Sequence, residues 1–95
     1  MAAYVISEVE MLEEAAWNCY RELAAESIAQ YGGRYLVRGA VQEIAEGPSS
    51  SRRVVIVEFP SMEILKKWYA SEAYSKALAF RDRALTRKLV FVEGI

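Results

Sequence analysis

The spacing of apolar residues changes period several times along the chain, and the resulting order of elements limits the possible folds more than any other feature. Short runs rich in β-branched and aromatic residues indicate strands, whereas apolar residues at three- and four-residue steps indicate amphipathic helices. The predicted strands are Ala3–Val9, Arg34–Ile44, Arg52–Phe59 and Lys88–Glu93. The predicted helices are about Leu12–Tyr31, a segment carrying Met62 to Tyr69, and about Glu72–Ala84.

The residues between these segments support the predicted boundaries. Ser61 and Ser71 are suitable N-caps for the two later helices, because a serine oxygen can accept a hydrogen bond from an amide of the first turn. Residues 46–51, with the sequence EGPSSS, are typical of a turn. Gly39 lies inside a strand pattern and suggests a bulge there.

This order predicts an α+β protein with the ferredoxin-like βαββαβ arrangement. Its four strands would form an antiparallel sheet in the order 4-1-3-2, with the helices on one face. The chain has 95 residues, which suffices for one hydrophobic core, so we expect a single domain over residues 1–95. The other face of the sheet would carry no helix.

Alternation along the strands assigns each side chain to one of the two faces. The set predicted beneath the helices is nearly all apolar: Val5, Ser7, Val9, Tyr35, Val37, Val55, Val57, Phe59, Val90 and Val92. The opposite set mixes large apolar and charged residues: Tyr4, Ile6, Glu8, Arg34, Leu36, Arg38, Val54, Ile56, Glu58, Leu89, Phe91 and Glu93. A patch of this kind invites aggregation unless a partner covers it. We therefore expect a homodimer with the two sheets face to face around a barrel-like interior.

The composition excludes several kinds of site. With no histidine, the chain has no Ser-His-Asp or Cys-His nucleophile and no imidazole ligand for a metal or haem. Its single cysteine, Cys19, permits neither an internal disulfide nor a cysteine-based zinc site, and we expect a buried, inert thiol in a reducing compartment. We expect no metal and no cofactor.

The charge pattern and the amino terminus bear on partners and location. There are 12 Lys and Arg residues against 13 Asp and Glu residues, and the basic residues form no stripe, so we expect no nucleic-acid binding. The chain shows no secretory signal pattern and no apolar run of about 18 residues. We therefore expect a cytoplasmic protein that does not bind a membrane.

Five polar residues are predicted to share a neighbourhood on the uncovered face: Tyr4, Arg34, Glu58 and Glu93 at one end of the sheet, and Arg38 a little deeper and close to Glu58. In a ligand-binding hypothesis, Arg34 or Arg38 binds the negative charge of a small organic molecule and Tyr4 donates a hydrogen bond. Glu58 or Glu93 would then act as acid or base. In the alternative, these charges form an ion-pair network that only fixes the register of the dimer.

The predicted helices are rich in aromatic residues: Trp17, Tyr20, Tyr31, Trp68, Tyr69 and Tyr74. One interpretation is that they fill the core beneath the helices. The other is that they line a cleft between helix and sheet that holds a small ligand, with Trp68 as a ligand-contacting residue.

Several segments carry a family resemblance. The chain contains GGRYLVRG at residues 32–39, EFPS at 58–61, WYASEAY at 68–74 and LVFVEG at 89–94, in this order. In this combination it resembles the small bacterial proteins grouped as domain of unknown function thirteen-thirty. The resemblance implies the dimeric α+β barrel superfamily and brings no established activity. Wider relatives include muconolactone isomerase-like enzymes and cofactor-independent monooxygenases, which use a pocket on the sheet.

The sequence thus predicts a homodimer that binds a small organic ligand in a pocket on the sheet face. The arginines favour a ligand that carries negative charge. Cofactor-free proton transfer or oxygenation are the candidate activities. The alternative is a non-catalytic dimerisation module or a regulatory ligand sensor, in which the Arg–Glu network is purely structural.

Overall fold

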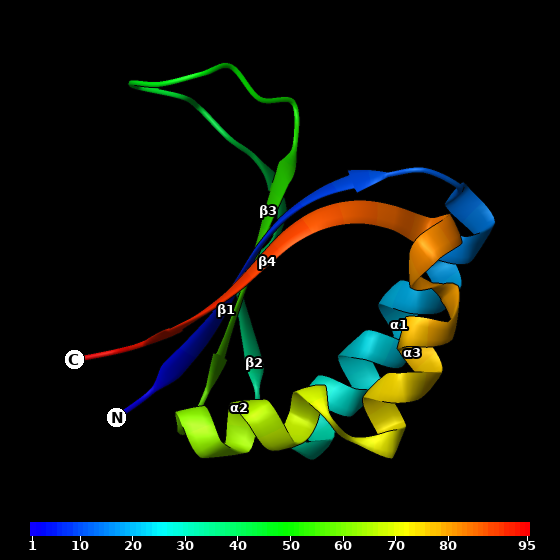
Figure 1. The fold of residues 1–95 in the computed structure, drawn as a ribbon, viewed down its shortest axis with the longest axis vertical. Helices are drawn as coiled ribbons and strands as arrows, with labels where there is room; N and C mark the ends of the chain where they lie inside the picture. Colours follow the sequence, from blue (N-terminus) through cyan, green and yellow to red (C-terminus); the bar gives the residue numbers. More distant parts are fainter.

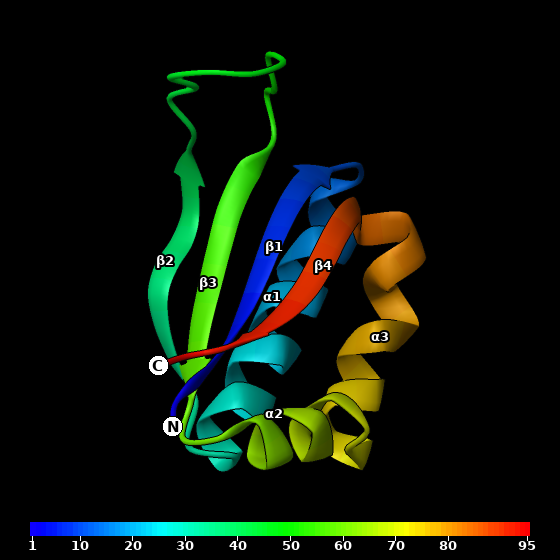
Figure 2. The same ribbon diagram turned by 60° about the vertical axis from the view of Figure 1, so that its left-hand side comes forward.

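The computed structural model describes all 95 residues and has the predicted order of elements (Figure 1). The elements are β1 (Ala3–Met11), α1 (Glu14–Gln30), β2 (Arg34–Val41), β3 (Arg53–Phe59), α2 (Met62–Tyr69), α3 (Glu72–Ala84) and β4 (Leu85–Glu93). The strands form one antiparallel sheet in the order β2-β3-β1-β4, so the predicted ferredoxin-like topology is confirmed. All helices lie on one side of this sheet, as Figures 1 and 2 show.

Local sequence explains where the helices begin and end. Ser61 Oγ accepts a hydrogen bond from the amide of Ile64 at 3.2 Å, and Ser71 Oγ accepts one from Tyr74 at 3.1 Å, so both predicted N-caps are confirmed. Helix α1 ends where Gly32 adopts a φ of 72°, a left-handed conformation that glycine tolerates. None of the helices is both long and apolar enough to cross a membrane.

The core lies between the helices and the sheet. Phe59 of β3, Leu65 of α2 and Tyr74 of α3 are fully buried there. The rings of Trp68 and Tyr74 lie 4.2 Å apart between their centroids, so α2 and α3 share one aromatic cluster. Cys19 is exposed, and the prediction of a buried thiol is therefore wrong.

The residues on the two faces of β4 are exchanged relative to the prediction. Phe91 pairs with Val5 and Leu89 pairs with Ser7, so both apolar side chains lie on the helix side and pack against the core. Val90 and Val92 lie on the uncovered face instead. The sequence Leu-Val-Phe-Val is apolar at four successive positions, so alternation could not decide which pair faces the helices.

Two irregularities in the pairing of β2 with β3 change the faces of β2. The predicted bulge is present between Arg38 and Ala40, where Gly39 has a φ of 81°. A second one, between Tyr35 and Val37, was not predicted, and it places Val37 opposite Ile56 on the uncovered face. Arg38 therefore lies opposite Val55 on the helix side, and its predicted position beside Glu58 is wrong.

The uncovered face mixes apolar and charged residues, as predicted, although some of these residues differ from the predicted set. Its apolar residues are Ile6, Val37, Val54, Ile56, Val90 and Val92. Tyr4, Glu8, Arg34, Glu58 and Lys88 lie on the same face. In Figure 2 no helix crosses this side of the sheet.

Candidate functional site

A cavity of about 640 Å³ lies between the helices and the sheet. Val5, Ser7 and Val9 of β1 contribute to its floor. Five aromatic side chains contribute to its wall: Trp17, Tyr20, Tyr35, Trp68 and Tyr74. The volume is within the range of small-molecule sites, roughly 300 to 1,000 Å³. The cleft considered from the aromatic content of the helices is therefore present, although Trp68 and Tyr74 also belong to the core.

Positive charge is concentrated on the wall of this cavity. Four arginines line it, Arg21, Arg38, Arg53 and Arg87, and the one acidic residue among them is Glu22. The formal charge of the lining is thus +3, although the whole chain carries −1. Apolar walls with a few convergent charged groups are typical of sites for small charged molecules.

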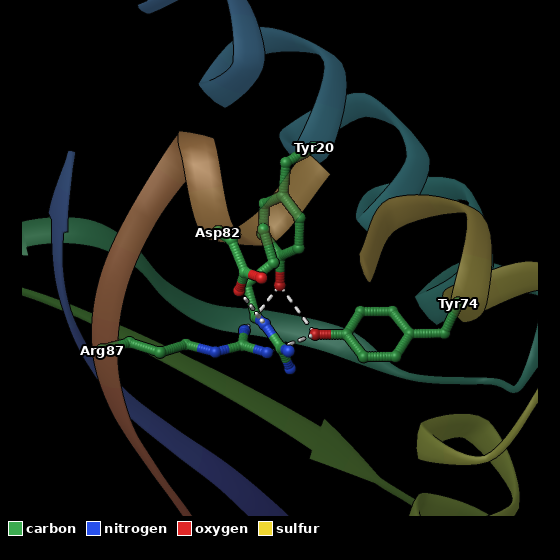
Figure 3. A network of polar contacts seen from close by, with 5 residues as sticks. Tyr20, Tyr74, Asp82 and Arg87 are labelled. Carbon is green, nitrogen blue, oxygen red and sulfur yellow. Dashed lines mark hydrogen bonds and ion pairs between the residues drawn. The ribbon is translucent and has the colours of Figure 1, made fainter. Parts of the chain in front are cut away.

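Arg87 of β4 reaches two tyrosines, one from each of the packed helices α1 and α3 (Figure 3). Its Nη1 donates to the hydroxyl of Tyr20 at 2.6 Å, and its Nη2 donates to the hydroxyl of Tyr74 at 2.9 Å. The two hydroxyls lie 2.7 Å apart and share a hydrogen bond. None of the ion pairs of the molecule involves Arg87. A half-buried guanidinium is thus held by neutral groups alone.

Burial and mutual contacts together shift the pKa values of Tyr35, Tyr74 and Arg87. Burial raises the pKa of Tyr74 well above its ordinary value, nearby Tyr20 raises it further, and Arg87 offsets only part of this. Burial also raises the pKa of Tyr35, against the opposing effect of Arg38. Although burial acts to lower it, the contacts with both tyrosines raise the pKa of Arg87. At neutral pH the cavity therefore carries a guanidinium cation beside the protonated phenol of Tyr74.

The predicted site residues do not form one cluster. On the uncovered face, Arg34 Nε donates to Glu58 Oε1 at 2.7 Å, and Tyr4 lies opposite Glu58 in the strand register. Glu93 is paired with Ala3, which assigns it to the helix side and separates it from this cluster. Arg38 lines the cavity on the other side of the sheet.

The two candidate acids, Glu58 and Glu93, both lie away from the cavity. The hydrogen bond from Arg34 lowers the pKa of Glu58, which keeps this carboxylate ionised at neutral pH. The cavity touches Arg38 and Trp68 but neither Glu58 nor Glu93. An acid or base role for these two residues stays a prediction.

Three cavity arginines were absent from the sequence-based site, namely Arg21, Arg53 and Arg87. Arg87 was not included because the strand was predicted to begin at Lys88, whereas β4 begins at Leu85. An alternating signal was available in Leu85, Arg87 and Leu89, which share the helix side of β4. Ser7 was expected beneath the helices, and it is 4% exposed with an unpartnered Oγ at the border of the cavity.

Comparison with known protein families assigns the chain to one of them. The family model described as domain of unknown function (DUF1330) matches residues 2–95. The chain belongs to this family. The resemblance noted from its sequence segments is thereby confirmed. A comparison with curated proteins gives no match.

Solved structures similar to this DUF1330 protein share its fold. A protein of unknown function from Rhodopseudomonas palustris has a TM-score of 0.80 and 17% identity, covering 99% of this chain and 82% of that chain. A dimeric ferredoxin-like protein of unknown function from Bacteroides fragilis has a TM-score of 0.65 and 12% identity, covering 98% and 96%. SnoaB, a cofactor-independent oxygenase from Streptomyces nogalater, has a TM-score of 0.58 and 8% identity, covering 99% and 93%.

Proposed function

We propose that this DUF1330 protein binds a small planar organic anion in the cavity between the helices and the sheet. The observation that carries the proposal is Arg87, a half-buried cation whose partners are the neutral hydroxyls of Tyr20 and Tyr74. Burying a charge is costly unless an opposite charge accompanies it. A ligand carboxylate or phenolate would supply that charge, and the planar guanidinium suits an oxyanion.

The rest of the wall favours a ring as the body of the ligand. Trp17 of α1 and Tyr35 of β2 are partly exposed on the wall of the cavity, and the buried rings of Tyr20, Trp68 and Tyr74 adjoin it. Aromatic side chains bind planar rings through offset or edge-to-face contacts as well as through apolar burial. The proposal is restricted to binding, because Glu58 and Glu93 do not line the cavity.

The uncovered face supports a different role, which we propose is pairing with a second copy of the chain. Arg34 and Glu58 satisfy each other there, as an ion pair that fixes register would. Apolar residues such as Ile6, Ile56 and Val90 occupy the remainder of the face. Two similar solved structures are described as dimeric proteins with a ferredoxin-like fold.

Binding of 2-naphthoate, measured by titration calorimetry, tests the cavity proposal. The wild-type protein should bind it, and Arg87→Met should weaken binding by tenfold or more, since a charge-assisted contact contributes about 1.5 to 3 kcal/mol. Arg83→Met is the matched control, because this exposed arginine of α3 does not line the cavity. Equal affinity of Arg87→Met and wild type would contradict the proposal.

A second measurement does not depend on the stability of the Arg87 variant. The wild-type protein should bind the neutral alcohol 2-naphthalenemethanol more weakly than 2-naphthoate, because only the acid supplies a charge for Arg87. Equal binding of the alcohol and the acid would contradict an anion site even if Arg87→Met failed to fold.

A further inference from the structure

The cavity carries a second group of positive charges that Arg87 does not account for. Arg38 and Arg53 both line the cavity, both are exposed, and neither forms an ion pair. They come from adjacent strands, since Arg38 of β2 lies opposite Val55 of β3, two residues from Arg53. We call these two residues the Arg38–Arg53 cluster.

An irregularity of β2 brings Arg38 to the cavity, whereas Arg53 reaches it through the regular alternation of β3. Uninterrupted alternation would place Arg38 on the same face as Arg34, away from the cavity. The shift between Tyr35 and Val37 transfers Arg38 to the helix side. Bulges are common next to binding sites because they re-aim a side chain in this way.

The bulges also supply neutral partners for the cluster. The carbonyl oxygen of Gly39 accepts a hydrogen bond from Arg53 Nη1 at 3.0 Å. The guanidinium of Arg38 lies over the ring of Tyr35, 4.4 Å from its centroid. Both side chains are therefore held at the cavity while their charges stay uncompensated. Glu22, the one acidic residue of the wall, forms no ion pair with either of them.

The sheet register sets the distance between this cluster and Arg87. Val9 of β1 pairs with Arg53 on one side and with Arg87 on the other. Adjacent strands lie about 4.8 Å apart, so the main chains at Arg53 and Arg87 are about 10 Å apart on the same side of the sheet. Arg38 belongs to β2, one strand further from Arg87. The cavity thus has one cation at Arg87 and a pair of cations two or more strands away, while the fourth arginine of its wall, Arg21 of α1, donates a hydrogen bond to Asn18.

We propose that the ligand is an elongated dianion, with one anionic group at Arg87 and the other at the Arg38–Arg53 cluster. A rigid aromatic body with acidic groups at opposite ends has this form. The inference rests on the proposed function and adds to it the class of ligand. It also assigns the Arg38–Arg53 cluster as the specificity-determining part of the site.

The test compares naphthalene-2,6-dicarboxylate with 2-naphthoate, which differ by one carboxylate. Wild-type protein should bind the dicarboxylate about fivefold more tightly, the effect of one additional charged contact at an exposed position. The double variant Arg38→Met/Arg53→Met should lose this preference, because its affinity for the dicarboxylate should fall more than its affinity for 2-naphthoate. Arg83→Met, which removes the same charge elsewhere, should retain the preference. Arg38→Met alone, which leaves the contact of Arg53 with Gly39, should lose part of it.

The outcomes separate this inference from the proposal beneath it. Equal affinities of the wild-type protein for the two acids would overturn the dianion inference alone. The same holds if the double variant weakens both acids equally. If neither acid binds to the wild-type protein, the cavity proposal fails and the dianion inference fails with it. Raising the salt concentration should weaken the dicarboxylate more than the monocarboxylate, since exposed charges are screened.

Discussion

Trp68 of α2 donates its indole N–H to the hydroxyl oxygen of Ser27 in α1, across 2.9 Å. Ser27 in turn donates to the carbonyl oxygen of Ala24 at 2.8 Å. Ser27 is 1% exposed and Trp68 is 2% exposed, so the hydrogen bond between them is shielded from bulk water. The contact fixes Trp68, an aromatic wall of the cavity, by joining two helices that are far apart in the sequence.

Ser27→Ala should therefore destabilise the fold. It leaves the indole N–H of Trp68 buried without a partner, which costs about 2 kcal/mol. For a domain of this size that corresponds to a decrease in Tm of roughly 10 °C in thermal denaturation. Ser75→Ala is the control, because Ser75 is exposed and its hydroxyl bonds only to the carbonyl of Glu72 in its own helix. Equal decreases in Tm for both variants would contradict the role of the Ser27 contact.

Gly33 is required because α1 and β3 approach each other closely at this position. A Cβ at residue 33 would lie 2.7 Å from Cε1 of Phe59 and 2.8 Å from Cγ2 of Ile28. Gly33→Ala should therefore lower the free energy of unfolding by about 2 kcal/mol, measured by urea denaturation, because extra volume in a packed core forces its neighbours to move.

A second substitution checks that the clash with Phe59 is the cause. Phe59→Leu removes the edge of the ring nearest to residue 33, so the double variant should lose less stability than the sum of the two single variants. Additive losses would place the cost of Gly33→Ala elsewhere, for instance at Ile28.

The ion pair between Arg34 and Glu58 should be visible in the titration of the carboxylate. The hydrogen bond from Arg34 holds the pKa of Glu58 below its ordinary value of 4.5, and Tyr4 adds a smaller effect. Arg34→Met should raise the pKa of Glu58 towards that value in a carbon-detected NMR titration. An unchanged pKa of Glu58 would contradict the pairing in solution.

The sign of the pH dependence follows from the same shift. Because the pKa of Glu58 is lower in the folded state, its ion pair stabilises the fold fully above the unfolded value, near 4.5. This contribution is lost as the pH falls through the lower folded value. The difference in stability between wild type and Arg34→Met should therefore diminish below about pH 4.5.

The sequence determined the order of the elements because the periodicities of the strands and of α1 are strong and the Ser61 and Ser71 caps are local signals. It could not determine side-chain faces where local signals conflict. The apolar stretch from Leu89 to Val92 fits either face of a strand, and the pairing of Ser7 with Leu89 decides between them. The shift between Tyr35 and Val37 carries no glycine, so nothing local indicated that Arg38 leaves the face of Arg34.

The site was harder to predict than the fold for a related reason. Arg34 and Glu58 were expected to lie near each other, and they form an ion pair. The network around Arg87 joins α1, α3 and β4, residues that are up to 67 positions apart in the chain. Such a cluster depends on tertiary packing, and its sequence signals were the aromatic content of the helices and the alternation of Leu85, Arg87 and Leu89.

Ile56→Glu should separate the proposed homodimer into monomers. Ile56 lies in the middle of the uncovered face, between Ile6 of β1 and Val37 of β2, so a carboxylate there would be buried against the partner without a counter-charge. Sedimentation velocity should show a dimer for the wild type and a monomer for the variant. Ala79→Glu, on the exposed side of α3, is the control and should remain dimeric. A dimer that persists in Ile56→Glu would place the interface on another surface, and the apolar residues of the uncovered face would then need a different partner.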